Sequence, residues 1–158
     1  MSARAIARGA LIGALYALLT LLTIPLGGGV QLRFSEALCV LPYFCPEAVP
    51  GLFVGCAVAN LVTGAVVLDV IFGSLATLAA AYLTYELKRR GASKWLAPLP
   101  AVLVNAVVVG LLLRYAYGVE LPLWMCMAGV FAGQALSCYG IGMPLWYALD
   151  RFGCKLFE

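Results

Sequence analysis

The stretch that decides the fold runs from Leu96 to Tyr115 and reads LAPLPAVLVNAVVVGLLLRY. Nearly all of it is apolar, and about 20 such residues let a helix cross the hydrocarbon core of a bilayer. One amide, Asn105, interrupts the run near its middle. A polar side chain at that depth is costly unless it is paired or contacts a ligand. The stretch therefore predicts a membrane-spanning helix and makes Asn105 a candidate functional residue.

Similar apolar runs fill the rest of the chain. Hydrophobic residues make up 65% of the 158 positions and the mean hydropathy is +1.03, which excludes an ordinary soluble domain. We expect an all-α polytopic membrane protein, a six-transmembrane-helix bundle in which residues 1–158 form a single integral-membrane domain. The N-terminal run is longer than the apolar region of a signal peptide, so we expect it to be retained. The expected spans are Ala5–Ile24, Ser35–Phe44, Val49–Val67, Leu68–Leu87, Leu96–Tyr115 and Leu121–Leu149, the second short and the last tilted or bent near Gly140, Gly142 and Pro144.

Basic residues favour one orientation of this bundle. Cytoplasmic loops of membrane proteins carry most of the lysine and arginine. With an even number of spans and a cytoplasmic N-terminus, only Arg33 and Arg114 fall at or near the outer face. The net charge of +3, without a dense basic patch, gives no indication of nucleic-acid binding. The basic residues then expected inside are Arg4, Arg8, Lys88, Arg89, Arg90, Lys94, Arg151 and Lys155.

This topology sorts the polar residues of the apolar stretches by depth. The charged ones map near the outer face, and Asn60 lies a turn or two below it. Asn105 and Gln134 lie on different helices, each roughly 15–20 Å from the outer end at about 1.5 Å rise per residue. We therefore expect a pocket that opens to the outside and has a polar floor. Its candidate substrate-binding residues are Arg33, Glu36, Asn60, Asp69, Asn105 and Gln134.

Structural roles stay open for the same side chains. Arg33 and Glu36 are one helical turn apart and can form an interfacial ion pair, and Asp69 can cap the helix that follows it. The three amides can join helices by hydrogen bonds, a common arrangement in membrane bundles. Glu120 is typical of a loop or helix-start carboxylate. Aromatic residues such as Tyr117 are typical of the membrane interface or the core rather than of a ligand contact.

Small residues recur at every fourth position in two of the expected spans. This spacing permits close approach of two helices. We expect one stripe to pack inside the bundle, while the first-span stripe can face a partner subunit. The stripes are Gly9, Gly13 and Ala17 in the first span and Gly51, Gly55 and Ala59 in the third.

The residue patterns typical of catalysis or metal binding are missing. The chain has no histidine, no CxxC pair, no DxxD or ExxE pair within a span and no GxxxxGK[ST] loop for a phosphate. We therefore expect no metal, no cofactor, no enzymatic activity and no ATP hydrolysis by this chain. The cysteines are expected to pack as small apolar residues: Cys39, Cys45, Cys56, Cys126, Cys138 and Cys154.

Six strings carry a family resemblance over nearly the whole chain: QLRFSEALCVLPYF (31–44), GLFVGCAVANL (51–61), LDVIFGSLATL (68–78), PAVLVNAVVVG (100–110), GQALSCY (133–139) and GIGMPL (140–145). They resemble the QueT family, the substrate-binding S components of energy-coupling factor (ECF) transporters. The resemblance implies six helices with an outward-facing pocket in a bacterial cell membrane. It implies a queuosine-related substrate, queuine or 7-aminomethyl-7-deazaguanine. It also implies a transmembrane coupling subunit and two cytoplasmic ATPases as partners.

The resemblance also implies roles for particular residues. S components dock to the coupling subunit through an AxxxA motif on the first helix, which Ala10 and Ala14 match. The family often has glutamate where this chain has Gln134, and an amide both donates and accepts whereas a carboxylate only accepts. For a deazaguanine we assign Glu36 or Asp69 to the N–H donors or a cationic arm, Asn105 and Gln134 to the base edge, and Arg33 to closure of the first loop.

Three other functions stay open. The first is an S component for another vitamin, such as folate or riboflavin. The second is a structural membrane subunit whose polar residues only join helices. The third is a small integral-membrane enzyme, for which the sequence offers no nucleophile with a base.

Overall fold

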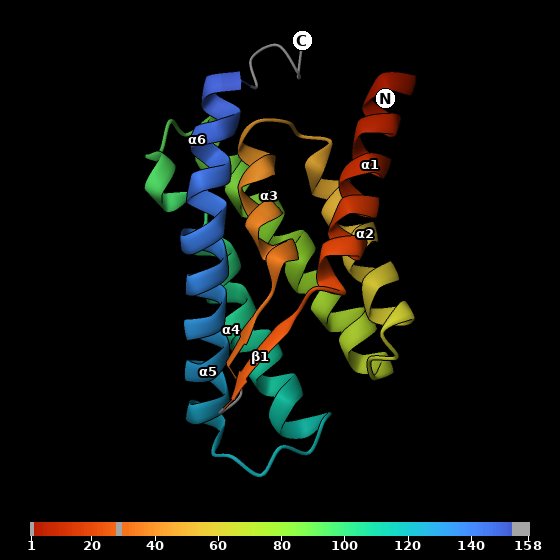
Figure 1. The fold of residues 1–158 in the computed structure, drawn as a ribbon, viewed down its shortest axis with the longest axis vertical. Coiled ribbons are helices and arrows are strands. Elements are labelled where there is room, and N and C mark those ends of the chain that lie inside the picture. The colour runs from red at the N-terminus through yellow and green to blue at the C-terminus, as the bar shows by residue number, and fades with distance from the viewer. Residues whose placement is uncertain (1, 28–29, 153–158) are drawn as a thin grey trace.

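The structure, a computed structural model, describes residues 2–27 and 30–152. Within that part the chain is almost entirely helical, with one two-stranded sheet. Figure 1 shows α1 beginning and α6 ending at one end of the molecule, with the β1–β2 hairpin and the α4–α5 connection toward the other. The α-helices are α1 (Ala3–Thr20), α2 (Ala48–Val62), α3 (Ser74–Arg89), α4 (Leu99–Tyr115), α5 (Leu123–Ala135) and α6 (Gly142–Phe152). The strands are β1 (Ile24–Gly27) and β2 (Val30–Leu32), and the tighter or wider helical turns are η1 (Phe34–Tyr43), η2 (Asp69–Gly73), η3 (Lys94–Leu96) and η4 (Leu136–Ile141).

Four helical segments in residues 2–27 and 30–152 are long and apolar enough to cross a membrane. They are Ala3–Thr20, Asp69–Arg89, Lys94–Tyr115 and Leu123–Arg151, which agree with four of the expected spans to within a few residues at most ends. The last is 29 residues long and takes π-helical geometry at η4, beside Gly140 and Gly142. The prediction of a helical, multi-pass membrane protein is confirmed, whereas the count of six spans is not.

The two remaining expected spans are shorter than a bilayer requires. Helix α2 has 15 residues, or about 22 Å at 1.5 Å per residue, against a hydrocarbon core of about 30 Å. The expected span Ser35–Phe44 is instead η1, a ten-residue 3₁₀ helix. Its residues from Ser35 to Pro42 are all buried. Its apolar side chains therefore pack against other helices of the bundle rather than against lipid.

The β1–β2 hairpin is a feature that the sequence analysis missed. The strands pair antiparallel, with Ile24 opposite Leu32 and Pro25 opposite Gln31. Strand β2 lies close to α5, where a Cβ atom on Gly133 would collide with the Gln31 carbonyl oxygen. Glycine at position 133 therefore lets the hairpin backbone pack directly against α5.

Helices α1 and α2 cross at very short range through their glycines. A Cβ atom on Gly51 would lie 2.6 Å from the Gly9 carbonyl oxygen, and one on Gly55 would lie 2.5 Å from that of Gly13. The two small-residue stripes therefore pack against each other. Gly9 and Gly13 pack against α2, so within this chain they serve the α1–α2 crossing.

Candidate substrate-binding site

A cavity of about 390 Å³ lies between β2, η2, α4 and α5. Its volume falls in the range of about 300–1,000 Å³ that is typical of small-molecule sites. Arg33, Asp69 and Gln134 line it, together with Gln31 and Tyr117. The remaining lining residues are apolar side chains of α4, α5 and the loop between them: Val109, Leu113, Val119 and Val130.

Asp69 is the carboxylate of this cavity. It is only 6% exposed, and its Oδ2 accepts a hydrogen bond of 2.6 Å from the Tyr117 hydroxyl. Asp69 is the first residue of η2 and makes no side-chain capping bond within the described chain. Asp69 therefore does not cap the helix that follows it in this structure. Its carboxylate points at the loop that connects α4 to α5.

Asn60 positions the backbone of Asp69 through a hydrogen bond. Its Nδ2 donates to the Asp69 carbonyl oxygen at 3.1 Å and lies 3.8 Å from Cys56 Sγ. Asn60 is buried and does not line the cavity. Gly73 leaves room for this arrangement, because a Cβ atom there would collide with Asp69 Oδ1. Asn60 thus acts on the cavity through Asp69.

Glu36 and Asn105 belong to a second, inner group. Glu36 is 4% exposed, and its Oε1 accepts from the Tyr16 hydroxyl at 2.8 Å. Its Oε2 accepts a long hydrogen bond of 3.5 Å from Asn105 Nδ2. The space beside these side chains is about 10 Å³, room for about one water molecule. This network, Tyr16–Glu36–Asn105, is closed to a ligand in the conformation seen.

Gln134 and Arg33 lie at the boundary between the two groups. Cys138 Sγ is 3.5 Å from both Gln134 Oε1 and the Glu36 carbonyl oxygen, and its one S–H can donate to one of them at a time. The Arg33 backbone N–H donates to Ser137 Oγ at 3.1 Å, which fixes the end of β2 against η4. No Arg33–Glu36 ion pair is present among residues 2–27 and 30–152. The guanidinium therefore stays available to the cavity it lines.

The cavity is lined by one acidic and one basic side chain. Asp69 and Arg33 are its charged lining residues, so their formal charges balance. Burial lowers the pKa of Arg33, but the influence of Tyr16, Glu36 and Asp69 outweighs it and raises that pKa above its ordinary value. Burial and the Asp69 hydrogen bond raise the pKa of Tyr117 to about 12. Among the lining residues, Asp69 is the one whose side chain can pair with a cationic ligand group.

The structure thus divides the six candidate residues. Three of them line the cavity, two form the inner network and one supports Asp69. Tyr117 is a cavity residue that the sequence analysis assigned to the interface or core. It lies two residues after the end of α4, next to Gly118 with φ +67°, and nothing in the sequence marked it as a cavity residue. Glu120 is exposed in the same loop, as expected.

Ala10 and Ala14 lie away from this site, on the exposed side of α1. Both are exposed and line an apolar groove of about 540 Å³ between α1 and α2. The floor of the groove is the glycine crossing described above, since Gly13 and Gly55 also line it. A helix from another subunit could approach the backbone closely there, because only small side chains intervene.

The cysteines and acidic residues form no metal centre in the described part of the chain, where no group of three possible ligands comes together. Cys39, Cys45, Cys56, Cys126 and Cys138 are free and buried. Cys154, for which we also expect a packing role, lies outside the described residues.

The fold defines a polytopic helical membrane protein with a polar cavity between its helices. The QueT transporter family model matches residues 6–151, nearly the whole chain. The chain therefore belongs to the QueT transporter family. Comparisons with curated proteins and with solved structures gave no match.

Proposed function

We propose that this chain is the substrate-binding S component of an ECF importer and that it captures a queuosine-related 7-deazaguanine, queuine or 7-aminomethyl-7-deazaguanine. The observation that carries the proposal is the cavity of about 390 Å³, which the buried carboxylate of Asp69 and the amide of Gln134 both line. Membership of a transporter family supports a transport role for this cavity.

The chemistry of the cavity suits an amine-bearing deazaguanine. A cationic arm can pair with the buried Asp69 side chain, which offers a charge-assisted hydrogen bond. Gln134 can both donate to a ring carbonyl and accept from a ring N–H. Arg33 can serve the carbonyl as well, and Tyr117 supplies an aromatic face in the cavity wall. Stacking of a base on such a face stabilises by roughly 1–3 kcal/mol.

The inner network has a separate role in this proposal. Glu36 and Asn105 lie beside a space of about 10 Å³, so a base reaches them only if Tyr16 or η1 moves. We assign them to the deep end of the site, where they receive the base edge after such a movement. Asn60 remains a positioning residue for Asp69.

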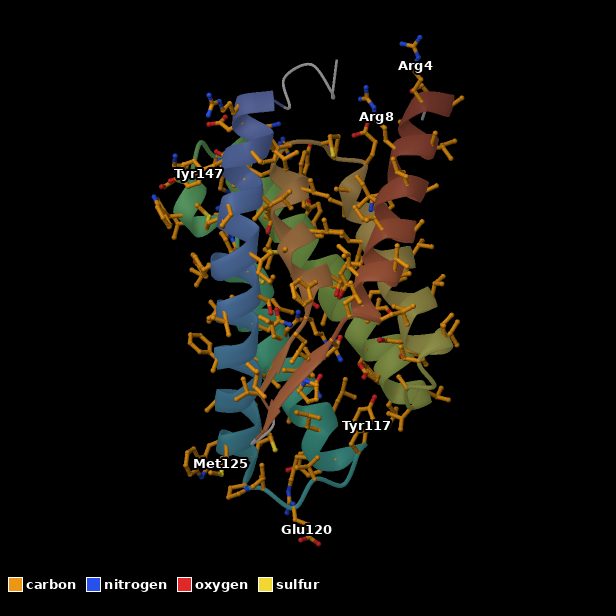
Figure 2. The ribbon with its side chains drawn as sticks, viewed as in Figure 1. Arg4, Arg8, Tyr117, Glu120, Met125 and Tyr147 are labelled. Atoms are coloured by element: carbon orange, nitrogen blue, oxygen red, sulfur yellow. The ribbon has the colours of Figure 1, made fainter. Side chains whose placement is uncertain are left out.

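Energy for uptake comes from partners in this proposal, because the sequence has no phosphate-binding loop. The partners are a transmembrane coupling subunit and two cytoplasmic ATPases, and docking uses Ala10 and Ala14 on α1. The termini are cytoplasmic. In support, Arg4 and Arg8 lie at the end of the molecule away from Tyr117 and Glu120 (Figure 2), as the positive-inside rule requires.

A ligand screen on the purified, detergent-solubilised protein tests the binding role. A ligand at a hundredfold excess over its Kd stabilises the folded state by about 2.7 kcal/mol, which thermal unfolding detects. We expect stabilisation by queuine or 7-aminomethyl-7-deazaguanine. We expect less by 7-cyano-7-deazaguanine and guanine, which have no arm with a cationic amine. Stabilisation by folate or riboflavin would replace the proposed substrate. No shift with any of them would favour a structural membrane subunit.

Docking is tested separately. In the double variant Ala10→Leu, Ala14→Leu, larger side chains fill the outer groove while the cavity between α4 and α5 stays intact. We expect unchanged ligand binding and loss of co-purification with the coupling subunit. Retained co-purification would move the docking surface elsewhere.

A further inference from the structure

A second apolar groove, of about 620 Å³, lies between α3 and α4 and shares no lining residue with the candidate substrate site. Leu83 and Leu87 of α3 and Leu99 and Leu103 of α4 contribute to its walls. Leu83 and Leu103 are 46% and 49% exposed. These helices belong to the segments Asp69–Arg89 and Lys94–Tyr115, which are long and apolar enough to span the membrane. The exposed leucines therefore face the lipid hydrocarbon.

One end of this groove carries a positive charge. Arg90, the residue that follows α3, lines the groove and is exposed. Glu86 also lines it, but Arg89 Nη1 binds Glu86 Oε1 at 2.8 Å and offsets that carboxylate. Arg90 has no ion-pair partner in residues 2–27 and 30–152. Lys94, the first residue of η3, has its Nζ 4.5 Å from the centre of the Tyr147 ring. The groove therefore has apolar walls and, at one end, a guanidinium that can bind an anion.

The loop that carries these cations is held at several points. The Tyr43 hydroxyl donates to the Ala92 carbonyl oxygen at 3.0 Å, and the Tyr139 hydroxyl donates to that of Trp95 at the same distance. The Thr84 hydroxyl donates to the Ala97 carbonyl oxygen at 2.9 Å. These bonds come from η1, η4 and α3 and fix the connection between α3 and α4 in position. A site on this loop needs little ordering when a ligand binds, which favours affinity.

We propose that the α3–α4 groove binds an anionic membrane phospholipid, with an acyl chain along the leucines and the phosphate on Arg90. An arginine fork matches phosphate oxygens in a bidentate fashion. Basic pockets between membrane helices at the headgroup level are typical sites for anionic lipids. The groove's charged end adjoins the connection between Asp69–Arg89 and Lys94–Tyr115, two segments long and apolar enough to cross a membrane, and such a connection is expected at that level. The lipid is the occupant because apolar walls and a terminal cation together match a phospholipid, whereas a soluble phosphate would leave the leucines uncovered.

Trp95 provides a direct optical test. It is 53% exposed and adjoins Leu96, which lines the groove. Trp146 is buried and gives a constant background, and Trp124 is removed by a Trp124→Phe substitution. The protein is reconstituted in vesicles of phosphatidylcholine. A small fraction of that lipid is then replaced either by dibrominated phosphatidylglycerol or by dibrominated phosphatidylcholine. Bromine quenches the Trp95 fluorescence on contact, so the two quenching curves report relative affinity.

We expect about fivefold tighter association of the anionic lipid, the ratio that about 1 kcal/mol per basic residue at a membrane surface provides. Arg90→Gln should reduce that ratio toward one. Lys88→Gln is the matched control, because it removes one charge from the same cluster. Its Nζ donates to the Phe44 carbonyl oxygen, and it does not line the groove. Equal quenching by the two lipids in the parent protein would overturn the proposal. An equal loss of preference in Lys88→Gln and Arg90→Gln would also overturn it. The preference would then come from the total positive charge of this surface and not from the groove.

Discussion

Replacing Asp69 by asparagine should separate amine-bearing from neutral ligands. The asparagine side chain keeps the size of the aspartate and an acceptor for the Tyr117 hydroxyl, so the 2.6 Å contact in the cavity wall can persist. What the substitution removes is the negative charge that faces the cavity. Hydrogen bonds to charged groups contribute about 1.5–3 kcal/mol. Asp69→Asn should therefore weaken binding of 7-aminomethyl-7-deazaguanine by about 10- to 150-fold.

The assay is isothermal titration of the purified variants with two ligands. The neutral 7-cyano-7-deazaguanine should bind the parent protein and Asp69→Asn with similar Kd, because it has no cationic arm. Glu120→Gln is the control variant, since Glu120 extends into solvent at the same end of the molecule as Tyr117 (Figure 2). If the parent protein binds the amine but Asp69→Asn changes its Kd less than twofold, or weakens both ligands equally, then Asp69 does not recognise the cation.

Three further predictions concern stability and pH. Tyr16→Phe removes the 2.8 Å donor to buried Glu36 Oε1 and should lower the free energy of unfolding by about 1.5–3 kcal/mol; thermal unfolding that matches the parent would contradict the network. Gly55→Ala should cost about 1–3 kcal/mol through overpacking against α1, whereas Gly140→Ala, whose Cβ atom meets nothing closer than 3.8 Å, should cost far less in the same measurement. The stability difference between the parent and Tyr117→Phe should be constant below about pH 10, the ordinary tyrosine pKa. It should then fall toward pH 12, because the raised pKa means that the folded protein keeps the phenol proton that the unfolded chain loses; a difference that stays constant to pH 12 would contradict the Asp69 contact.

Membrane helices could be predicted from the sequence because their signal is local. The run from Leu96 to Tyr115 is long and apolar in any context, and the structure has a span at Lys94–Tyr115. The run from Ser35 to Phe44 is equally apolar but too short to decide by itself between lipid and protein surroundings. In the structure it is η1, buried among other helices. The hairpin was missed because Pro25 and its neighbouring glycines resemble a loop, and strand pairing depends on a partner segment.

The candidate site shows the same division. Polar residues inside apolar stretches pointed to Arg33, Asp69 and Gln134, which do line one cavity. The same signal could not distinguish them from Glu36, which lies in the closed inner network. Tyr117 carried no distinguishing signal among many aromatic residues, and its role depends on a contact with a residue 48 positions earlier in the chain.

The sequence alone determined that this chain enters a membrane as helices, because burial of apolar side chains and of backbone hydrogen bonds in lipid depends on local composition and length. It also carried the strings of the QueT transporter family. Only the tertiary structure decided which polar side chains share a cavity. That outcome depends on how β2, η2, α4 and α5 pack, and packing is set by close contacts between distant residues, such as Gly133 against Gln31.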